Sequence, residues 1–300
     1  MNTTPVMQAG APGHPAAAAT AAGTGHGGEV LLRGTEITRR WGGLVAVDKV
    51  SIALRRGEVH AVIGTNGAGK STLINILSGE IPPSSGRVEL LGQDVTAWSQ
   101  PKRARAGLGR SYQRTTIYPN FTVAENCRLA AQARHPRPWA IWQPASRCPD
   151  STAAAAAAMA RTGLAEVAER VAGLLSHGQK RQLEIAMCLA TGPEVLLLDE
   201  PLAGMGAEET DRMLGLLDEL KRPLDGSKLP SSPEGSPAAR ERPSAASAGH
   251  AILLVEHDMD AVFRIADRIT VMVNGAVIAS DTPEAVRASP EVQAAYLGGH

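Results

Sequence analysis

The chain has few aromatic residues, few cysteines and no net charge. Only 3% of its 300 residues are Phe, Trp or Tyr, and three are cysteines, Cys127, Cys148 and Cys188. The cysteine spacing matches no metal-ligand pattern, so we interpret them as reduced thiols, which are typical of a cytosolic protein. Thirty basic and thirty acidic side chains cancel. This balance gives no support for nucleic acid as the main partner.

The sequence also lacks membrane-spanning and targeting patterns. No apolar run reaches the roughly 20 residues that a helix needs to cross a bilayer. No Lys or Arg precedes Arg33, so we expect neither a secretory signal nor an Arg-rich transit peptide. If the protein serves a membrane, we expect it to act from the cytoplasmic side through partners.

What the chain does contain is enough apolar sequence for a substantial core. Hydrophobic residues make up 43% of it, which suffices for one large domain or two small ones. Two stretches are instead rich in Ala, Gly, Pro and Ser. Because they carry too little apolar surface to fold, we predict a disordered tail at 1–28 and a disordered insertion at 222–249.

A glycine-rich segment lies between a predicted strand, 59–63, and a predicted helix, 71–77. It fits the phosphate-binding pattern G-x-x-x-x-G-K-[ST] and reads Gly64, Thr65, Asn66, Gly67, Ala68, Gly69, Lys70, Ser71, Thr72. Glycines let successive backbone N–H groups face a phosphate chain, and the helix N-terminus adds partial positive charge. Lys70 can bind the outer phosphates, and the Ser71 hydroxyl can bind Mg²⁺.

Two carboxylates directly follow a second apolar run. Residues 195–198 are Val and Leu, as in a central parallel strand, and Asp199 and Glu200 come next. The first carboxylate can hold Mg²⁺, and the second can deprotonate an attacking water. Earlier in the chain, Ser176 and Gly178 lie where a helix begins, and such a helix end suits an anion. Because the glycine-rich loop already serves the phosphates, this helix end suggests a second face that closes on the nucleotide.

The remaining pattern predicts an alternation of sheet and helix. A capping box at Thr122–Glu125 starts a helical region that runs to 175. A stretch with four prolines and two tryptophans at 135–149 is expected to break it. An Asn274-Gly275 turn of type I′ joins the two strands of a hairpin over 269–279. Two short capped helices follow at 282 and 289. Further strands are expected at 31–41, 50–54, 87–91 and, ending with Gln113, 109–113.

These motifs resemble those of the nucleotide-binding subunits of ABC transporters. Gly64–Thr72 resembles the Walker A motif, and Val195–Glu200 resembles Walker B followed by the catalytic glutamate. Leu175–Gln179 resembles the signature motif L-S-G-G-Q, with His177 in place of the first glycine. The similarity extends to three single residues: Gln113 in the Q-loop, the switch histidine His257, and Trp41, which falls where the family stacks an aromatic on adenine.

The resemblance implies an α/β fold, namely a P-loop ABC-type nucleotide-binding domain with an N-terminal antiparallel β-subdomain and a helical subdomain. The ATPase core would comprise 29–113 and 176–300, and the helical subdomain 114–175. Three departures from the family pattern stand out. Thr65 occupies a position where Pro is more usual, and the loop after Walker B has no carboxylate until Glu208. Trp41 is bulkier than the usual Tyr or Phe, and it could stack on adenine or be an ordinary buried anchor.

The resemblance also implies roles. The cofactors would be ATP and Mg²⁺. Catalysis would use Glu200, His257 and Gln113, and the metal would be held by Ser71, Gln113 and Asp199. The nucleotide would contact Trp41 and the loop Gly64–Thr72 in one subunit. It would contact Ser176, Gly178 and Gln179 of the opposite subunit.

Several segments are most similar to bacterial branched-chain amino acid uptake ATPases, among them Trp41–Val47, Arg110–Gln113 and Val255–Phe263. The chain would then power an importer from the cytoplasmic face of the inner membrane. Its partners would be two integral membrane permease subunits, a second ATPase subunit, identical or paralogous, and a periplasmic solute-binding protein. Urea and amide uptake ATPases and lipopolysaccharide-export ATPases remain alternatives. A soluble ABC protein that remodels ribosomes or DNA ends ranks lower. Such proteins generally carry two nucleotide sites or a long coiled coil, whereas this chain has one set of nucleotide-site motifs and no heptad repeat.

A groove between Gln113 and the helix near Thr122 is where the family receives a coupling helix of the membrane subunit. Four residues give this neighbourhood an unusual share of aromatic and apolar side chains: Tyr112, Ile117, Tyr118 and Phe121. We interpret them as interface residues. The alternative is that they fill the joint between the two subdomains.

Overall fold

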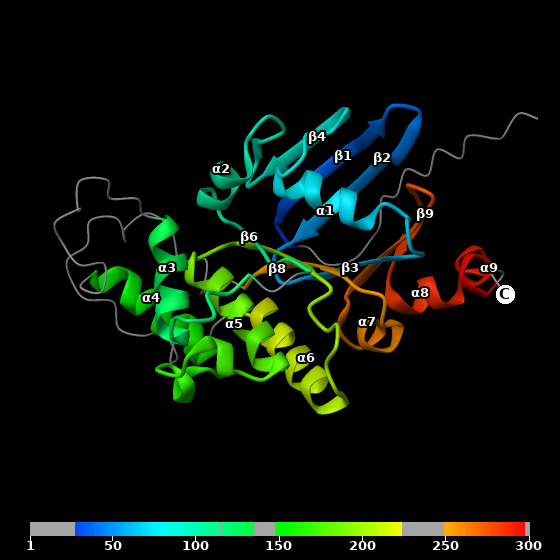
Figure 1. Ribbon diagram of the computed structural model, residues 1–300. Helices are drawn as coiled ribbons and strands as arrows, with labels where there is room; N and C mark the ends of the chain where they lie inside the picture. Colours follow the sequence, from blue (N-terminus) through cyan, green and yellow to red (C-terminus); the bar gives the residue numbers. More distant parts are fainter. Residues whose placement is uncertain (1–27, 114–115, 135–147, 224–248, 298–300) are drawn as a thin grey trace, which may run out of the picture.

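The computed structural model describes residues 28–113, 116–134, 148–223 and 249–297. Two sheets organise the described residues (Figure 1). One is antiparallel, with strand order β2-β1-β4-β5, and the other has strand order β10-β9-β3-β8-β7-β6. In the second sheet all neighbours pair in parallel except β10, which pairs antiparallel with β9.

The first sheet contains β1 Val30–Trp41, β2 Leu44–Arg55, β4 Ser85–Leu90 and β5 Gln93–Asp94. The second sheet contains β3 Val59–Gly64, β6 Leu108–Arg110, β7 Val195–Asp199, β8 Ala251–Val255, β9 Arg268–Val273 and β10 Ala276–Asp281. The helices are α1 Lys70–Ser78, α2 Gln100–Arg105, α3 Val123–Arg134, α4 Pro149–Arg161, α5 His177–Ala190, α6 Ala207–Lys221, α7 Met259–Ile265, α8 Pro283–Ala288 and α9 Pro290–Leu297. The α/β fold with an antiparallel sheet near the N-terminus is as predicted.

Each face of the second sheet supports its own core. Successive residues of a strand point to opposite faces, and both faces of β7 are buried. Leu196 and Leu198 pack in a cluster with helices α3 to α6, whereas Val195 and Leu197 pack in a cluster with α1 and the antiparallel sheet. This two-sided burial is why the strand reads as an uninterrupted apolar run.

The hairpin and helix caps follow the predicted local chemistry. Asn274 and Gly275 have φ angles of 48° and 84°, as a type I′ turn requires. The amide of Glu125 donates to Thr122 Oγ1, and the amide of Thr122 donates to Glu125 Oε2. These reciprocal bonds form the predicted capping box at the start of α3.

Three predicted boundaries are wrong. β2 begins at Leu44, because 44–47 pair with β1 across the Gly42-Gly43 turn. The region from 122 to 175 is not helical throughout: the described part between α4 and α5 forms turns and two 3₁₀ segments, Ala165–Val167 and Ala172–Leu174. β6 ends at Arg110, before Gln113. The break predicted at 135–149, the tail predicted at 1–28 and the insertion predicted at 222–249 fall mostly outside the described residues.

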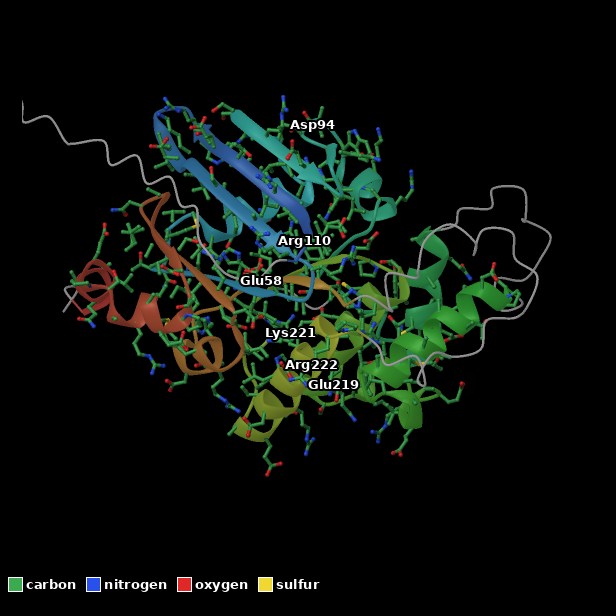
Figure 2. All side chains as sticks on the ribbon, turned by 180° about the vertical axis from the view of Figure 1, so that it is seen from behind. Glu58, Asp94, Arg110, Glu219, Lys221 and Arg222 are labelled. Carbon is green, nitrogen blue, oxygen red and sulfur yellow. The ribbon has the colours of Figure 1, made fainter. Side chains whose placement is uncertain are left out.

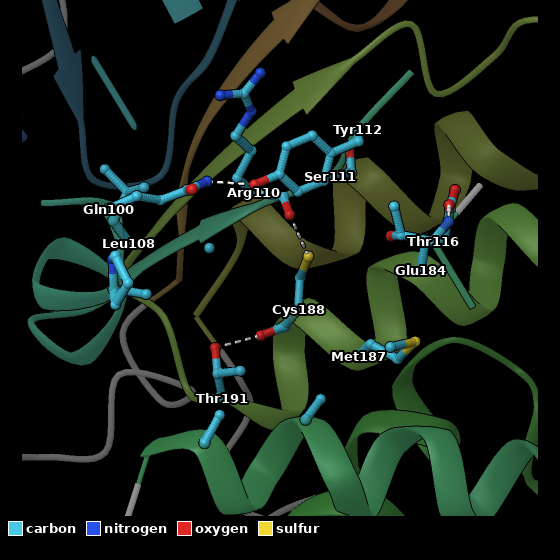
Figure 3. A pocket seen from close by; sticks show the side chains of 15 residues that line it. Gln100, Leu108, Arg110, Ser111, Tyr112, Thr116, Glu184, Met187, Cys188 and Thr191 are labelled. Atoms are coloured by element: carbon cyan, nitrogen blue, oxygen red, sulfur yellow. Dashed lines mark hydrogen bonds between the residues drawn. The ribbon is translucent and has the colours of Figure 1, made fainter. Parts of the chain in front are cut away.

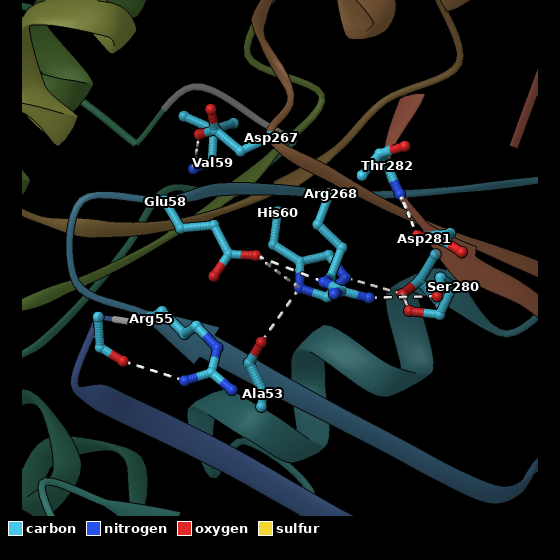
Figure 4. A network of polar contacts seen from close by, with 12 residues as sticks. Ala53, Arg55, Glu58, Val59, His60, Asp267, Arg268, Ser280, Asp281 and Thr282 are labelled. Carbon is cyan, nitrogen blue, oxygen red and sulfur yellow. Dashed lines mark hydrogen bonds and ion pairs between the residues drawn. The ribbon is translucent and has the colours of Figure 1, made fainter. Parts of the chain in front are cut away.

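A buried polar network lies at the amino ends of the parallel strands (Figure 4). The His60 ring bonds Ala53 O through Nδ1 and Thr270 Oγ1 through Nε2. Burial lowers the pKa of His60 to about 4, so the ring is neutral and Nδ1–H donates to the carbonyl. Beside it, Arg268 Nε lies 3.8 Å from Glu58 Oε1, and burial raises the pKa of Glu58.

Two more contacts close the same end of the sheet. Lys221, at the end of α6 (Figure 2), donates to Asp267 at 3.0 Å, and Asp267 accepts from the amide of Val59. The His250 ring, just before β8, bonds Pro193 O and Arg161 Nη1, each at 3.0 Å. These bonds join α4 and α6 to the sheet at the end opposite the glycine-rich loop.

Candidate nucleotide-binding site

The glycine-rich loop joins β3 to α1 and is shaped by close backbone contacts. A Cβ atom on Gly69 would lie 2.3 Å from Ala46 O, and one on Gly64 would lie 2.2 Å from Met272 O. Gly69 also has a φ angle of 95°, which disfavours other residues. The amide of Gly275 donates to Ala68 O. The loop is therefore held against β2 and the β9–β10 turn and opens at the start of α1.

Lys70 is folded back over this loop. Its ammonium donates to Gly64 O at 2.7 Å and to Thr65 O at 3.1 Å. Burial lowers the pKa of Lys70, and the nearby carboxylates Glu200 and Asp199 oppose that shift. The ammonium is thus preorganised where a phosphate cradled by the loop would lie.

Asp199 and Glu200 lie at the carboxyl end of β7, beside the loop. Asp199 is buried, and burial raises its pKa, with the guanidinium of Arg110 acting in the opposite direction. Glu200 has a φ angle of 49°, and its amide donates to Val255 O of β8. Its side chain remains 25% exposed. This backbone turn aims the carboxylate toward the space in front of the loop.

Two side chains from other segments lie close to the Glu200 carboxylate. Gln113 Nε2 donates to Glu200 Oε2 at 2.9 Å, and His257 Nδ1 lies 3.9 Å from Glu200 Oε1. The structure therefore brings together the three residues predicted as catalytic. The arrangement can polarise a water and contact a terminal phosphate at one point.

The position of Gln113 depends on α5 rather than on the sheet. After Ser111 bonds Leu197 O, the chain leaves β6. Arg181 of α5 donates to Tyr112 O at 3.1 Å and to Gln113 O at 2.7 Å, and it pairs with Glu184 at 2.8 Å. These side-chain contacts take the place of sheet pairing, which explains the early end of β6.

The sequence interpretation did not identify Arg181 and Glu184 as functional residues. Their signal is an opposite-charge pair three residues apart in a helix that is otherwise rich in buried apolar residues, such as Leu183 and Ala186. A buried charge requires a partner, so the pair could have been singled out as positioning residues.

Glu256 is a second residue that the sequence interpretation missed. It is buried directly before His257, and its carboxylate accepts from the amides of Leu202 at 2.8 Å and His257 at 3.3 Å. Burial raises the pKa of Glu256 to about 7. It connects the loop after Glu200 to the segment that carries His257.

Trp41 is 49% exposed, which contradicts the alternative of a buried anchor. It lies at the end of β1, and the guanidinium of Arg39 lies 3.9 Å from the centre of its ring. Arg39 also donates to Pro82 O. The ring is thus held by a cation–π contact and offers an apolar surface to a ligand.

The residues of the second predicted face form a separate group at the start of α5. Ser176 and Gln179 form a capping box there, and the hydroxyl of Ser176 lies 3.4 Å from Glu209 Oε1. Among the described residues, no hydrogen bond or ion pair joins Ser176 or Gln179 to the Lys70 and Glu200 group. The His177 ring bonds Ala203 O at 3.0 Å, so it is attached to the loop after Glu200.

A cavity of about 340 Å³ lies beside Gln113, between β6, α2, α3 and α5 (Figure 3). Tyr112, Met187 and Cys188 line it, and burial raises the pKa of the Cys188 thiol to about 12. Tyr118 and Phe121 lie outside this lining. They are 49% and 43% exposed and stack on each other with ring centres 5.5 Å apart. The alternative that these two rings fill a joint is therefore wrong.

The donor set suits a nucleotide-bound Mg²⁺ better than a protein-only metal cage. No group of three or more His, Cys, Asp or Glu side chains in the described ranges could hold a metal ion. Mg²⁺ in phosphate sites is typically bound through one or two carboxylates, waters and the substrate's own phosphates, and Ser71 and Asp199 fit that pattern. None of the helices described here is both long and apolar enough to span a bilayer.

Comparison with known proteins gives consistent matches. The family model described as "ABC transporter" matches residues 47–203, and one described as "Branched-chain amino acid ATP-binding cassette transporter" matches residues 276–300. The chain is 36% identical to the high-affinity branched-chain amino acid transport ATP-binding protein BraF of Pseudomonas aeruginosa. It is 37% identical to LivG of Salmonella typhimurium, which carries the same description. Each alignment covers 89% of this chain and 98% of the relative.

Solved structures agree with this. A crystal structure of the ADP conformation of an ATP-binding cassette from an ABC transporter superposes with a TM-score of 0.72 at 28% identity. The superposition covers 90% of this chain and 99% of the other.

Proposed function

Because this chain belongs to the ABC transporter family of ATPases, we propose that it is the ATP-hydrolysing subunit of an importer for branched-chain or related amino acids. The observation that supports hydrolysis here is the meeting of Gln113 and His257 at Glu200, beside Lys70. The substrate class rests on relatives named for high-affinity branched-chain amino acid transport.

In this proposal the loop Gly64–Thr72 and Lys70 bind the phosphates of ATP, and Trp41 stacks on the adenine. Ser71, Asp199 and Gln113 hold Mg²⁺, which neutralises phosphate charge when bound. Glu200 orients and deprotonates the attacking water. His257 contacts the terminal phosphate, so that charge developing in the transition state meets groups that are already in place.

We further propose that the start of α5 acts on the nucleotide of a second ATPase subunit. Ser176, Gly178 and Gln179 surround a helix N-terminus that can receive an anion, yet they contact Glu209 and each other rather than the Lys70 group. Head-to-tail closure of two subunits would place each nucleotide between the glycine-rich loop of one subunit and the start of α5 of the other. ATP binding would favour this closure, and hydrolysis would reverse it.

The membrane partners would dock beside Gln113. The cavity between α2 and α5 lies next to the site, and the exposed stack of Tyr118 and Phe121 offers aromatic contact area, which is enriched at interfaces. We propose that two permease subunits bind here on the cytoplasmic side of the inner membrane and that a periplasmic protein supplies the solute. The division into an ATPase core (29–113 and 176–300) and a helical subdomain (114–175) belongs to the same proposal.

Uptake measurements test the function. In a strain that lacks this chain, uptake of labelled leucine should fall, and the wild-type chain should restore it whereas Glu200→Gln should not. Urea and a short amide serve as comparison solutes. Full leucine uptake in the deletion strain would contradict the amino acid assignment, and a selective loss of urea or amide uptake would favour that alternative.

A further inference from the structure

A carboxylate from α6 rests on the start of α5. Glu209 Oε1 lies 3.4 Å from Ser176 Oγ. A Cβ atom added to Gly178 would lie only 2.6 Å from the same oxygen, so the carboxylate packs directly over that glycine. Both residues line a cavity of about 180 Å³ between the two helices. Only a residue without a side chain at 178 allows Glu209 to take this position.

The place that Glu209 occupies is suited to anions in general. The first amides of a helix have no intrahelical acceptor, and here these belong to His177 and Gly178. The aligned peptide dipoles add partial positive charge. A carboxylate gains from this environment, and so does a terminal phosphate. Because two anions at one place repel each other, they compete for it.

Another cationic group is available to Glu209 within its own helix. Arg212 lies one turn further along α6 and lines the same cavity. In the structure it is 3.6 Å from Glu208, and both of these side chains are strongly exposed. A carboxylate that leaves Ser176 could therefore pair with Arg212 without any movement of the backbone.

We propose that Glu209 is a positioning residue that holds Ser176 and the start of α5 until the terminal phosphate of the second subunit's ATP displaces it. The proposal rests on the two-faced site described above. The Glu209 contact sets the ATP concentration at which two subunits close, because a contact that only the open state makes must be lost on closure. Without the carboxylate, closure should need less ATP.

The chain offers a matched control for this charge. Glu208 and Glu209 both lie in the first turn of α6, so both interact with that helix dipole and both carry one negative charge. Glu208 is exposed and pairs only with Arg212 in the contacts among described residues. Neutralising Glu208 therefore removes the same charge from the first turn of α6 and keeps the contact of Glu209 with α5, while it releases Arg212 from an exposed ion pair.

The experiment measures ATP-driven dimer formation by analytical ultracentrifugation of the full-length chain. A Glu200→Gln parent, in which hydrolysis is slowed, is compared with Glu200→Gln/Glu209→Gln and Glu200→Gln/Glu208→Gln. We expect the half-saturating ATP concentration to fall roughly two- to tenfold for the Glu209 variant. For the Glu208 variant we expect a smaller fall, because the pair whose loss frees Arg212 is exposed and weak. Thermal melting of each protein runs alongside.

A merely structural role for Glu209 predicts the opposite sign, since a weakened α5 would raise the ATP requirement and lower the melting temperature. An unchanged or raised half-saturation in the Glu209 variant overturns the inference while leaving the two-faced site intact. If the parent binds ATP but does not dimerise, with or without Glu209→Gln, the two-faced site is wrong and the inference falls with it. Dimerisation by the Glu209 variant alone would support it.

Discussion

The two ends of the parallel strands carry similar residues, glutamate and histidine, but differ in how far protein groups contact and bury them. At the amino ends, Glu58 precedes β3, Glu194 precedes β7 and His250 precedes β8, and protein groups contact each of them. At the carboxyl ends, Glu200 follows β7 and His257 lies after β8, and these side chains remain 25% and 64% exposed. The amino-end residues are therefore contacted by protein groups, although Glu58 Oε2 has no hydrogen-bond partner among the described residues, whereas the carboxyl-end side chains stay accessible to a ligand.

The surroundings of the histidines show the same contrast. His60 and His250 are buried at the amino ends, and burial lowers their pKa values to about 4 and about 3. Each is a neutral ring with both nitrogens bonded. His257 has room around it and a carboxylate at 3.9 Å. Ligands of open α/β sheets bind outside the carboxyl ends of strands, and here the residue types alone would not have distinguished the two ends.

The largest expected effect comes from exchanging a carboxylate for an amide at each end of β7. Glu200→Gln should reduce ATP turnover by at least roughly 10²-fold, because the group that deprotonates the water is lost. Glu194→Gln, which weakens the pair with Arg56, should leave turnover almost unchanged. Steady-state ATPase assays and nucleotide-binding titrations check both. Near-normal turnover in Glu200→Gln would place the base elsewhere.

The two histidines that flank β8 provide the next comparison. His250→Ala should lower the free energy of unfolding by about 3 kcal/mol, because Arg161 and Pro193 O lose their partner and a cavity remains. His257→Ala should leave it within about 0.5 kcal/mol, since that side chain is exposed. Denaturant unfolding measures the stabilities, and the ATPase assay should show the reverse order of damage. Equal destabilisation by both changes would remove the distinction between the ends.

Glu256 lies at the carboxyl ends of the strands but is buried like the residues at the amino ends. The pH dependence of protein stability tests whether burial alters its protonation. Its pKa is raised by burial to about 7 from an ordinary value of 4.5. A carboxyl whose pKa is raised on folding contributes stability that is fully present below pH 4.5 and is lost as pH rises through 7. The unfolding free energy of the wild type should therefore fall by about 1 kcal/mol more than that of Glu256→Gln between pH 6 and 8. Parallel curves would show that Glu256 does not titrate between pH 6 and 8.

The smallest effect is expected from replacing residues 222–248, whose flanking residues lie at the amino ends of the parallel strands. The amide of His250 donates to Leu220 O, and Gly249 packs against the backbone of Lys221. Because the flanks already touch, a short Gly-Ser bridge can replace residues 222–248. We expect the melting temperature to change by no more than about 2 °C and ATPase activity to be retained. Differential scanning calorimetry checks this, and a large drop would mean that the segment packs on the core.

Local sequence determined the elements that depend on near neighbours. The β3–loop–α1 unit, the capping box at Thr122, the Asn274-Gly275 turn and the apolar β7 strand all formed as predicted, because each requires only a short run of suitable residues. One boundary that was predicted wrongly depends on a distant group. β6 ends early because Arg181, on α5, takes the carbonyls of Tyr112 and Gln113.

The motif residues of the candidate site could be named from sequence because their spacing is regular, but their mutual contacts could not. Gln113, Glu200 and His257 are far apart in the chain. Parallel pairing of β7 with β8 brings Glu200 and His257 together, and Arg181 of α5 positions Gln113 beside them. Burial decides the rest. The sequence does not predict that the pKa of Glu256 is near 7 or that the pKa of His250 is near 3, because those values depend on which groups surround each side chain after folding.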